Sequence, residues 1–234
     1  MAKHIWTKQI TPKIVYVETR TQELLGKTFC RVQEHYESPE WAGKIFTLGQ
    51  YREWYTREFG AFDYYSTVCG TNLPSSCLKP FLEGLFDPLS EEEKVLIEFF
   101  RCRQDDFYII GGTTEGDSTA TFNHEVTHGL FATCPEYRKE VLRLVARVKE
   151  EYPERMMLLL EYFKESAYAE KHYDDEINAY ISCDSEYLRD KNIKFKAEII
   201  SQFETLRSTY LSAEREKTDA KVRVYMTGDL LEEK

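Results

Sequence analysis

Residues 124–128 read His-Glu-Val-Thr-His, and this spacing constrains the fold of the chain more than any other feature. On an α-helix, positions i and i+4 lie on one face, one turn above the other. In a helix, His124 and His128 therefore stand together on a single face. The pattern predicts a helix here, with capping residues at its start around Asp117 or Ser118.

Two imidazoles placed in this way can bind one metal ion, each through a nitrogen at roughly 2.0–2.1 Å from Zn²⁺. Glu125 lies about 100° further round the helix. That position is poor for a third ligand, but it suits a carboxylate that takes a proton from a metal-bound water, whose pKa zinc lowers to about 7. The alternative interpretation is an amphipathic helix with two half-buried histidines, each hydrogen-bonded to a neighbour.

A catalytic zinc site needs a third protein ligand and an open fourth position. The sequence from residue 173 to residue 180 reads as a helix start, with Asp174 suited to the N-cap. A capped, solvated first turn is the favoured interpretation of Asp174 and Asp175. Glu176 is the favoured third ligand, because Ala179 one turn later lets a neighbouring helix approach closely. The other candidates are His172, Asp174, Asp175 and Asp184.

These residues resemble the zincin metallopeptidases, specifically the gluzincin branch, in which a glutamate on a later helix completes an HExxH motif. The resemblance covers the motif and the element order over about residues 105–190. It implies that His124, His128 and Glu176 bind zinc and that Glu125 activates water. It also implies an edge strand beside the active-site helix that pairs with the substrate backbone. The matching segment consists of Phe107, Tyr108, Ile109 and Ile110.

The chain departs from the thermolysin-like pattern around the expected ligand glutamate. That pattern has an asparagine directly before the glutamate and an aspartate four positions after it, whereas this chain has Asp175 and Tyr180 at these positions. The resemblance therefore does not assign the residue that orients a ligand histidine, and Asp184 and Asp175 are the candidates. A metzincin site fits worse, because a phenylalanine and a cysteine stand where that branch has glycine and histidine. These two residues are Phe131 and Cys134.

A hydrolase of this kind also needs a hydrogen-bond donor for the oxyanion of the transition state. Tyr180 and Tyr173 are the candidates for this transition-state stabiliser, and Tyr168 is within plausible reach. With 16 tyrosines in the chain, the sequence does not single out one of them.

The hydrophobic pattern predicts an α+β fold. We expect one zincin-like domain over residues 1–234, with a small mixed α/β part containing a β-sheet at about 1–112 and a predominantly helical part with the metal site at 113–234. The predicted strands are residues 14–17, 44–48, 61–68, 107–110 and 221–226. The predicted helices before the motif are residues 21–36, where apolar residues form a stripe with helical spacing, 50–59, and 91–100, which a capping box of Ser90 and Glu93 begins. Pro135 suits the first turn of a later helix. Residues 69–88 read as an irregular loop, and the Gly/Thr-rich residues 111–116 read as a flexible rim.

The composition excludes two classes of function. The chain has 31 Lys+Arg against 41 Asp+Glu, which gives a net charge of −10. A protein that binds nucleic acid or an anionic membrane needs a basic face. No apolar run approaches the roughly 18 residues of a membrane helix, and the N-terminus lacks a secretory signal. We therefore expect a cytoplasmic protein whose six cysteines are reduced.

The sequence thus predicts a zinc-dependent hydrolase, first of all a metallopeptidase with a peptide or protein substrate. In this hypothesis, zinc-bound water activated by Glu125 attacks a peptide carbonyl. The alternative is a catalytically silent zincin-like scaffold that binds metal or a partner protein. A third reading is a zinc hydrolase that acts on a non-peptide amide or ester.

Overall fold

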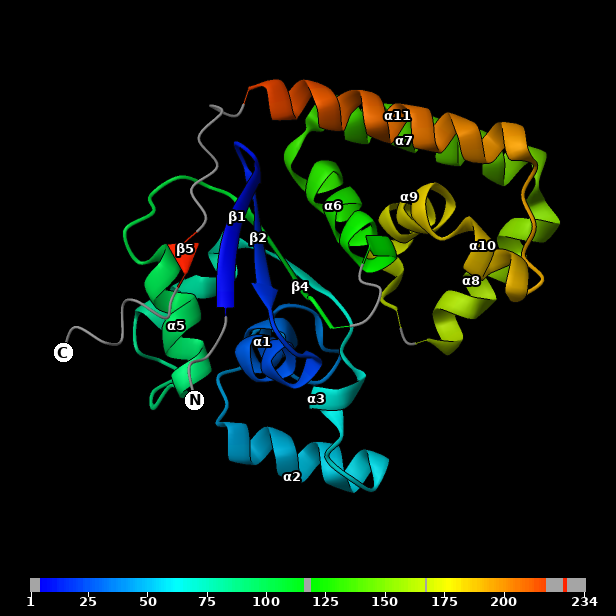
Figure 1. Ribbon diagram of the computed structural model, residues 1–234. Coiled ribbons are helices and arrows are strands. Elements are labelled where there is room, and N and C mark those ends of the chain that lie inside the picture. The colour runs from blue at the N-terminus through cyan, green and yellow to red at the C-terminus, as the bar shows by residue number, and fades with distance from the viewer. Residues whose placement is uncertain (1–4, 116–118, 167, 218–224, 227–234) are drawn as a thin grey trace. The chain divides into compact units, whose positions relative to one another are not determined.

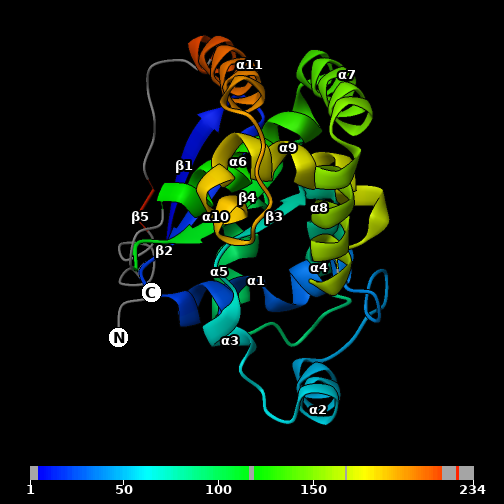
Figure 2. The same cartoon turned by 90° about the vertical axis from the view of Figure 1, so that its right-hand side faces the viewer.

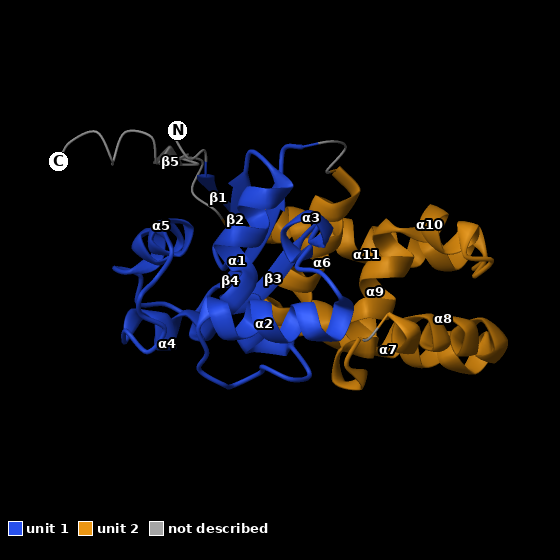
Figure 3. Ribbon diagram, turned by 90° about the horizontal axis from the view of Figure 1, so that it is seen from below, with its two compact units in different colours: residues 1–118, 220–234 blue, residues 119–219 orange. Residues whose placement is uncertain are grey.

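The computed structural model describes residues 5–115, 119–166 and 168–217, and the backbone of residues 225–226 (Figure 1). The chain divides into two compact units, shown in different colours in Figure 3. Unit 1 contains residues 1–118 and 220–234, and unit 2 contains Thr119–Asp219. The division falls close to the predicted change from a mixed part to a helical part, and the α+β fold class is confirmed.

Unit 1 contains a mixed β-sheet with the strand order β3-β4-β2-β1-β5. Strand β4 runs parallel to β2, and the other neighbouring pairs are antiparallel. The strands are β1 (Ile5–Thr11), β2 (Ile14–Thr19), β3 (Thr71–Pro74), β4 (Tyr108–Thr113) and β5 (Tyr225–Met226). The predicted strand at 14–17 is therefore confirmed. Of the predicted strand at 221–226, the last two residues form β5, and the first four lie outside the described residues.

The inner strands β2 and β4 are almost entirely buried, which explains their apolar sequences. Two glycines within β4 are required by close packing. A Cβ atom on Gly111 would overlap the side chains of Thr71 and Phe29, and one on Gly112 would lie 2.7 Å from the hydroxyl of Tyr16. The Gly/Thr-rich segment predicted as a flexible rim is therefore strand as far as Thr113, while residue 116 lies outside the described residues.

The strand predicted at residues 107–110 is present, but its expected place at the edge of the sheet is wrong. β4 pairs with β2 on one side and with β3 on the other. The backbone of Phe107 is also hydrogen-bonded: its N–H donates to Ser75 Oγ at 3.1 Å, and its carbonyl accepts from Ser75 N at 2.9 Å. The backbone of Phe107, Tyr108, Ile109 and Ile110 therefore has no free side to which a substrate strand can add.

Helix α1 (Gln22–Glu37) packs against β2, β3 and β4 and contributes the predicted apolar stripe to the core. Its first turn is capped twice: Leu24 N donates to Thr21 Oγ1 at 3.2 Å, and Gln22 N donates to Glu115 Oε2 at 2.8 Å. The other helices of unit 1 are α2 (Leu48–Phe59), α3 (Tyr64–Thr67), η1 (Ser75–Leu78), α4 (Lys79–Leu82) and α5 (Glu91–Phe100).

The strands predicted at residues 44–48 and 61–68 are wrong. Thr47 forms a capping box with Gln50 and begins α2, and residues 61–68 contain the short helix α3. The segment 69–88, predicted as an irregular loop, contains β3, η1 and α4, and the strand β1 was not predicted. The capping box predicted at Ser90 and Glu93 is confirmed, and it begins α5.

A buried ion pair joins α1 to α5. Arg31 contacts Glu93 through two bonds, Nε–Oε1 at 2.7 Å and Nη2–Oε2 at 2.5 Å, and both side chains are only 3% exposed. The same guanidinium donates to the carbonyls of Phe86 at 2.9 Å and Pro88 at 3.3 Å. Arg31 therefore also fixes the segment that leads into α5.

Unit 2 is helical. Its elements are α6 (Thr119–Thr133), α7 (Pro135–Glu151), α8 (Pro153–Glu165), η2 (Glu170–His172), α9 (Tyr173–Cys183), α10 (Ser185–Asp190) and α11 (Ala197–Glu216). Pro135 occupies the first turn of α7, as predicted. Helix α9 packs against α6, α7, α8, α10 and α11, and Figure 2 shows it surrounded by these neighbours. Seven consecutive residues of α9, from Glu176 to Ser182, are therefore buried.

The six cysteines all lie in the described residues and are free thiols, in agreement with the prediction. None of the described helices combines the length and the apolar character that crossing a bilayer requires.

We expect Arg31→Met to lower the free energy of unfolding by about 3–5 kcal/mol, because it leaves the Glu93 carboxylate buried without its partner. Urea denaturation followed by circular dichroism measures this change. The matched control is Arg57→Met, whose exposed pair with Glu58 should contribute less than about 1 kcal/mol. Equal stability of the two variants would contradict the role given to Arg31.

Candidate metal centre

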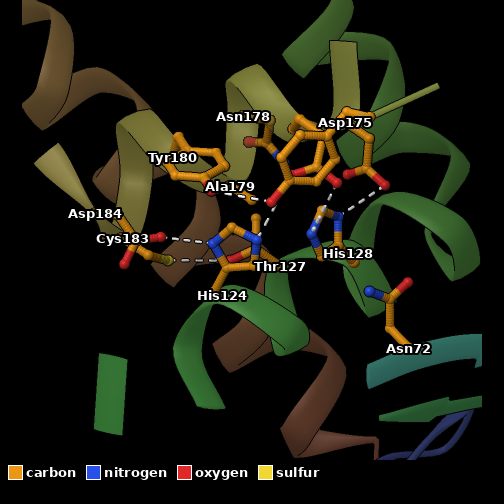
Figure 4. A network of polar contacts seen from close by, with 12 residues as sticks. Asn72, His124, Thr127, His128, Asp175, Asn178, Ala179, Tyr180, Cys183 and Asp184 are labelled. Atoms are coloured by element: carbon orange, nitrogen blue, oxygen red, sulfur yellow. Dashed lines mark hydrogen bonds and ion pairs between the residues drawn. The ribbon is translucent and has the colours of Figure 1, made fainter. Parts of the chain in front are cut away.

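Helix α6 carries the motif that the sequence singled out. The helix is confirmed over residues 119–133, and its predicted cap at Asp117 or Ser118 lies outside the described residues. His128 is 3% exposed and Glu125 is 7% exposed, while His124 is partly buried. The two imidazoles stand side by side, with ring centroids 4.7 Å apart (Figure 4). The predicted placement of both histidines on one face is therefore confirmed.

Helix α9 supplies the third side chain. Ligand atoms of His124, His128 and Glu176 all lie within 4.8 Å of one another. The Nε2 atom of His124 lies 3.7 Å from Glu176 Oε2, and the Nε2 atom of His128 lies 3.7 Å from Glu176 Oε1. The carboxylate thus faces both imidazoles at once, one oxygen to each ring.

These distances fit a shared ion better than direct bonds. A separation of 3.7 Å is too long for a hydrogen bond between a ring nitrogen and a carboxylate oxygen. Two ligands that each lie about 2.1 Å from a tetrahedral zinc are about 3.4 Å apart. In addition, Glu176 Oε2 is buried and has no hydrogen-bond partner among the described residues. A cation between the three side chains would satisfy this oxygen.

The other nitrogen of each imidazole is held by an aspartate. His124 Nδ1 lies 2.5 Å from Asp184 Oδ2, and His128 Nδ1 lies 3.0 Å from Asp175 Oδ2 (Figure 4). A carboxylate at Nδ1 fixes the ring orientation and leaves the Nε2 lone pair for a metal. Metal-binding histidines almost always have such a partner, so this arrangement is the feature that most distinguishes the site from two ordinary buried histidines.

The pKa values reflect this crowding of charges. Burial lowers the pKa of His124, but the carboxylates of Asp184 and Glu176 outweigh it and hold the pKa well above its usual range. The charges of Asp175 and Glu176 likewise outweigh burial and raise the pKa of His128 to about 9. Burial raises the pKa of Asp175. Burial also acts to raise the pKa of Glu176, but the neighbouring imidazoles of His128 and His124 outweigh it and lower this pKa. A cation at Nε2 would take the place of the proton that these carboxylates favour.

The other candidates for the third ligand lie in different surroundings. The Asp174 side chain is 42% exposed and forms an ion pair with Lys149 at 2.6 Å, which confirms that it is solvated. Its predicted place at the N-cap is wrong, because α9 begins one residue earlier, at Tyr173. The solvated interpretation of Asp175 is wrong, because its carboxylate is 16% exposed and bound to His128. His172 lies on η2 and does not belong to the group of converging ligand atoms.

The two predicted transition-state stabilisers occupy different surroundings. The ring of Tyr180 stands edge-on to His124 at 5.1 Å, and its hydroxyl contacts the hydroxyls of Tyr168 and Tyr162. The ring of Tyr173 instead packs against Phe163 of α8 at 5.5 Å and lines an open groove together with residues of α8.

Two further polar contacts hold α9 in place and were not foreseen from the sequence. Thr127, inside the motif, contacts the Cys183 thiol at 3.3 Å, and the buried Tyr137 of α7 donates to Asn178 Oδ1 at 2.9 Å. One hint is present in the sequence, because Thr127 lies on the same predicted helix as the two histidines. The partners of Thr127 and Tyr137 lie 56 and 41 residues away in the sequence, so only the packing of the helices reveals these contacts.

No protein-family model, no curated protein and no solved structure matches this chain.

If the converging group binds zinc, we expect His124→Ala and Glu176→Ala each to weaken this binding at least about 100-fold, because each removes one of the three candidate ligands. Elemental analysis and calorimetric titration of the purified variants measure this. The control is His172→Ala, which keeps the converging group intact and should bind zinc as the wild type does. Unchanged zinc content in the first two variants would refute the ligand assignment.

We also expect Asp184→Asn and Asp175→Asn each to weaken zinc binding by about 10- to 100-fold without loss of the fold, because the amide no longer holds the imidazole as a charged acceptor. Asp174→Asn is the matched control, since this neighbouring aspartate contacts Lys149 instead. Its zinc affinity should stay within about twofold of wild type. Equal affinities in all three variants would show that the aspartates do not orient the ligands.

Proposed function

We propose that this protein is a zinc-dependent hydrolase with a zincin-like metal site, and that its substrates are peptides. The observation that carries the proposal is the convergence of two imidazole Nε2 atoms on one carboxylate, with both Nδ1 atoms held by aspartates. This arrangement satisfies the spacing, orientation and support that a zinc site requires.

The ligand count favours a catalytic site over a structural one. Structural zinc sites have four protein ligands, usually cysteine and histidine, whereas catalytic sites have three and leave a position for water or substrate. The converging group consists of His124, His128 and Glu176, and it contains no cysteine. A set of two histidines and one glutamate leaves one coordination position for chemistry.

Glu125 is the proposed general base. It follows His124 directly on α6, is almost fully buried, and its charge acts on the His124 ring. Bound zinc would lower the pKa of a water to about 7 and polarise a carbonyl. Glu125 then accepts the proton of the attacking water and returns it to the leaving nitrogen, so that one carboxylate acts first as base and then as acid.

The substrate-pairing role expected for residues 107–110 does not belong to this proposal, because both sides of β4 are occupied. The proposal rests on unit 2 alone, which contains all three ligands, both supporting aspartates and Glu125.

The alternative function is a metal-binding scaffold without turnover, in which the site stabilises unit 2 or supports contact with a partner protein. The burial of His128, Glu125 and Glu176, all 7% exposed or less, favours this alternative, because a peptide must reach these side chains to be cleaved. A hydrolase for a non-peptide amide or ester shares the same ligands and differs in substrate.

The deciding experiment uses Glu125→Gln. We expect this variant to bind zinc with wild-type stoichiometry but to cleave a mixed-peptide library at least about 100-fold more slowly, because the amide accepts no proton. Mass spectrometry of the digests measures cleavage, and wild type treated with a chelator is the control. Full activity of Glu125→Gln would remove Glu125 from the mechanism. A wild-type protein that binds zinc but cleaves no peptide would favour the scaffold or the other hydrolase.

A further inference from the structure

An open groove runs along one side of helix α8 in unit 2. Its volume is about 570 Å³, which lies in the usual range of binding pockets. Its lining is mostly apolar, and one of the lining side chains, Met157, is 55% exposed. The apolar lining residues are Pro153, Met156, Met157, Leu160 and Tyr173. An apolar surface of this size that is open to solvent is typical of a site where another molecule binds.

The length of the groove matches a short helix. Its lining residues extend along α8 from Pro153 to Lys164, and these 164 − 153 = 11 steps of about 1.5 Å cover about 16 Å. The same length accommodates about three turns of a second helix, which presents an apolar residue at every third or fourth position. The two methionines suit such a contact, because their unbranched side chains adapt to apolar faces of different shape.

The walls of the groove favour a helix over an extended peptide. The lining residues belong to α7, α8, η2 and α9, so this part of the described chain offers no strand edge to a peptide backbone. The N–H and C=O groups of an extended peptide would lose water over the apolar lining without gaining partners. A helix satisfies these groups within itself and contacts the groove through its side chains alone.

The charged residues around the groove are mainly acidic. Of the four that line it, Lys149 is neutralised by its ion pair with Asp174 at 2.6 Å. The other three form no ion pair among the described residues, and they are Glu161, Lys164 and Glu170. Lys164 offsets only one of the two glutamates. Over residues 150–171, the exposed side chains that the structure describes include six glutamates and three basic residues. Basic side chains on a partner would therefore complement this surface.

We propose that this groove is a docking site for a basic amphipathic helix of a partner protein. The apolar face of that helix packs on Met156, Met157 and Leu160, and its basic side chains lie opposite Glu161 and Glu170. The inference does not depend on the proposed hydrolase function, because none of the lining residues belongs to the candidate metal centre. It gives the protein a second function, the recognition of a helical segment.

Fluorescence anisotropy of the full chain with three labelled peptides, each about 16 residues long, tests this proposal. The first peptide has leucines at helical spacing and lysines on its other faces. The second has glutamate in place of each lysine, and the third keeps the lysines but has two central prolines that prevent a helix. We expect the first peptide to bind with a Kd below about 100 μM and the other two to bind at least about 10-fold more weakly.

Two pairs of surface variants locate the binding. Met157→Asp should weaken binding of the basic helical peptide at least about 10-fold, because it places a charge on the apolar contact. Its control is Leu142→Asp, which alters a residue of α7 that is 40% exposed outside the groove. Glu161→Lys should weaken binding at least about 5-fold, and Glu204→Lys on α11 makes the same change in net charge outside the groove. Both controls should stay within about twofold of wild type.

Circular dichroism checks that each variant is folded. No saturable binding of the basic helical peptide to wild type would overturn the proposal, as would unchanged binding by Met157→Asp. Equal losses in Glu161→Lys and Glu204→Lys would also overturn it, because attraction to the net charge of the chain would then explain the binding. Equal affinity for the peptide with prolines would assign the groove to an extended segment instead.

Sedimentation of the chain alone tests the remaining occupant, a second copy of this chain. We expect wild type and Met157→Asp to sediment alike, because the groove is proposed to bind a different protein. A wild-type dimer that Met157→Asp dissociates would show that the groove is an interface between two copies, and would overturn the proposal.

Discussion

Two imidazole–carboxylate pairs are the interaction on which the rest of the candidate site depends. Asp184 holds His124 and Asp175 holds His128, both at Nδ1. Without these contacts an imidazole can turn about its bond to Cβ, and its Nε2 atom has no fixed direction. With them, both Nε2 atoms point at the carboxylate between them. The convergence of the three ligand atoms is therefore a consequence of the aspartates as much as of the ligands themselves.

The charge balance of this cluster gives a second reason to expect a cation. Four carboxylates, those of Glu125, Asp175, Glu176 and Asp184, surround two imidazoles in a mostly buried site. Even with both rings protonated, the formal negative charges exceed the positive ones. Buried charge is costly unless it is paired or coordinates a metal. With both rings neutral, as metal binding at Nε2 requires, the four carboxylates have no positive partner, and a divalent cation at the open centre would supply two positive charges.

The helix packing of unit 2 explains why these groups can hold their geometry. Helix α9 is surrounded by five other helices, so Glu176 projects from a segment that has little freedom to move. Ala179 is fully buried one turn later, in agreement with the close approach of helices that the sequence predicted. The contacts of Thr127 with Cys183 and of Tyr137 with Asn178 fix α9 against α6 and α7. A rigid frame of this kind is what a preorganised site requires.

Local signals predicted much of the secondary structure. The capping box at Ser90, the proline at the start of α7 and the apolar stripe of α1 each act within a few residues, and each prediction is confirmed. One error was a missed local signal, because residues 44–48 were predicted as a strand although Thr47 and Gln50 form a capping box that begins a helix. Residues 61–68, an aromatic run, were also predicted as a strand but contain the short helix α3. Short apolar runs fit a strand or a buried loop equally well, and only their partners decide between them.

The place of β4 in the sheet shows the same limit. The apolar run and the two glycines predict a strand, but no residue of β4 specifies how many neighbours it has. The pairing with β3 depends on a segment about 35 residues earlier, whose own pattern reads as an irregular loop. Whether a strand lies at an edge is thus decided by long-range hydrogen bonds.

The sequence by itself determined that His124 and His128 share a helix face and that Glu125 lies beside them, because the periodicity of a helix fixes this spacing. It did not determine the fates of the three consecutive acidic residues at the start of α9. Asp174 binds a surface lysine, Asp175 holds an imidazole, and Glu176 joins the two histidines in the group that could hold a metal ion. Successive residues of a helix point about 100° apart, so these carboxylates face three different surroundings. Only the packing of α9 against α6 decided which of them faces the candidate metal centre.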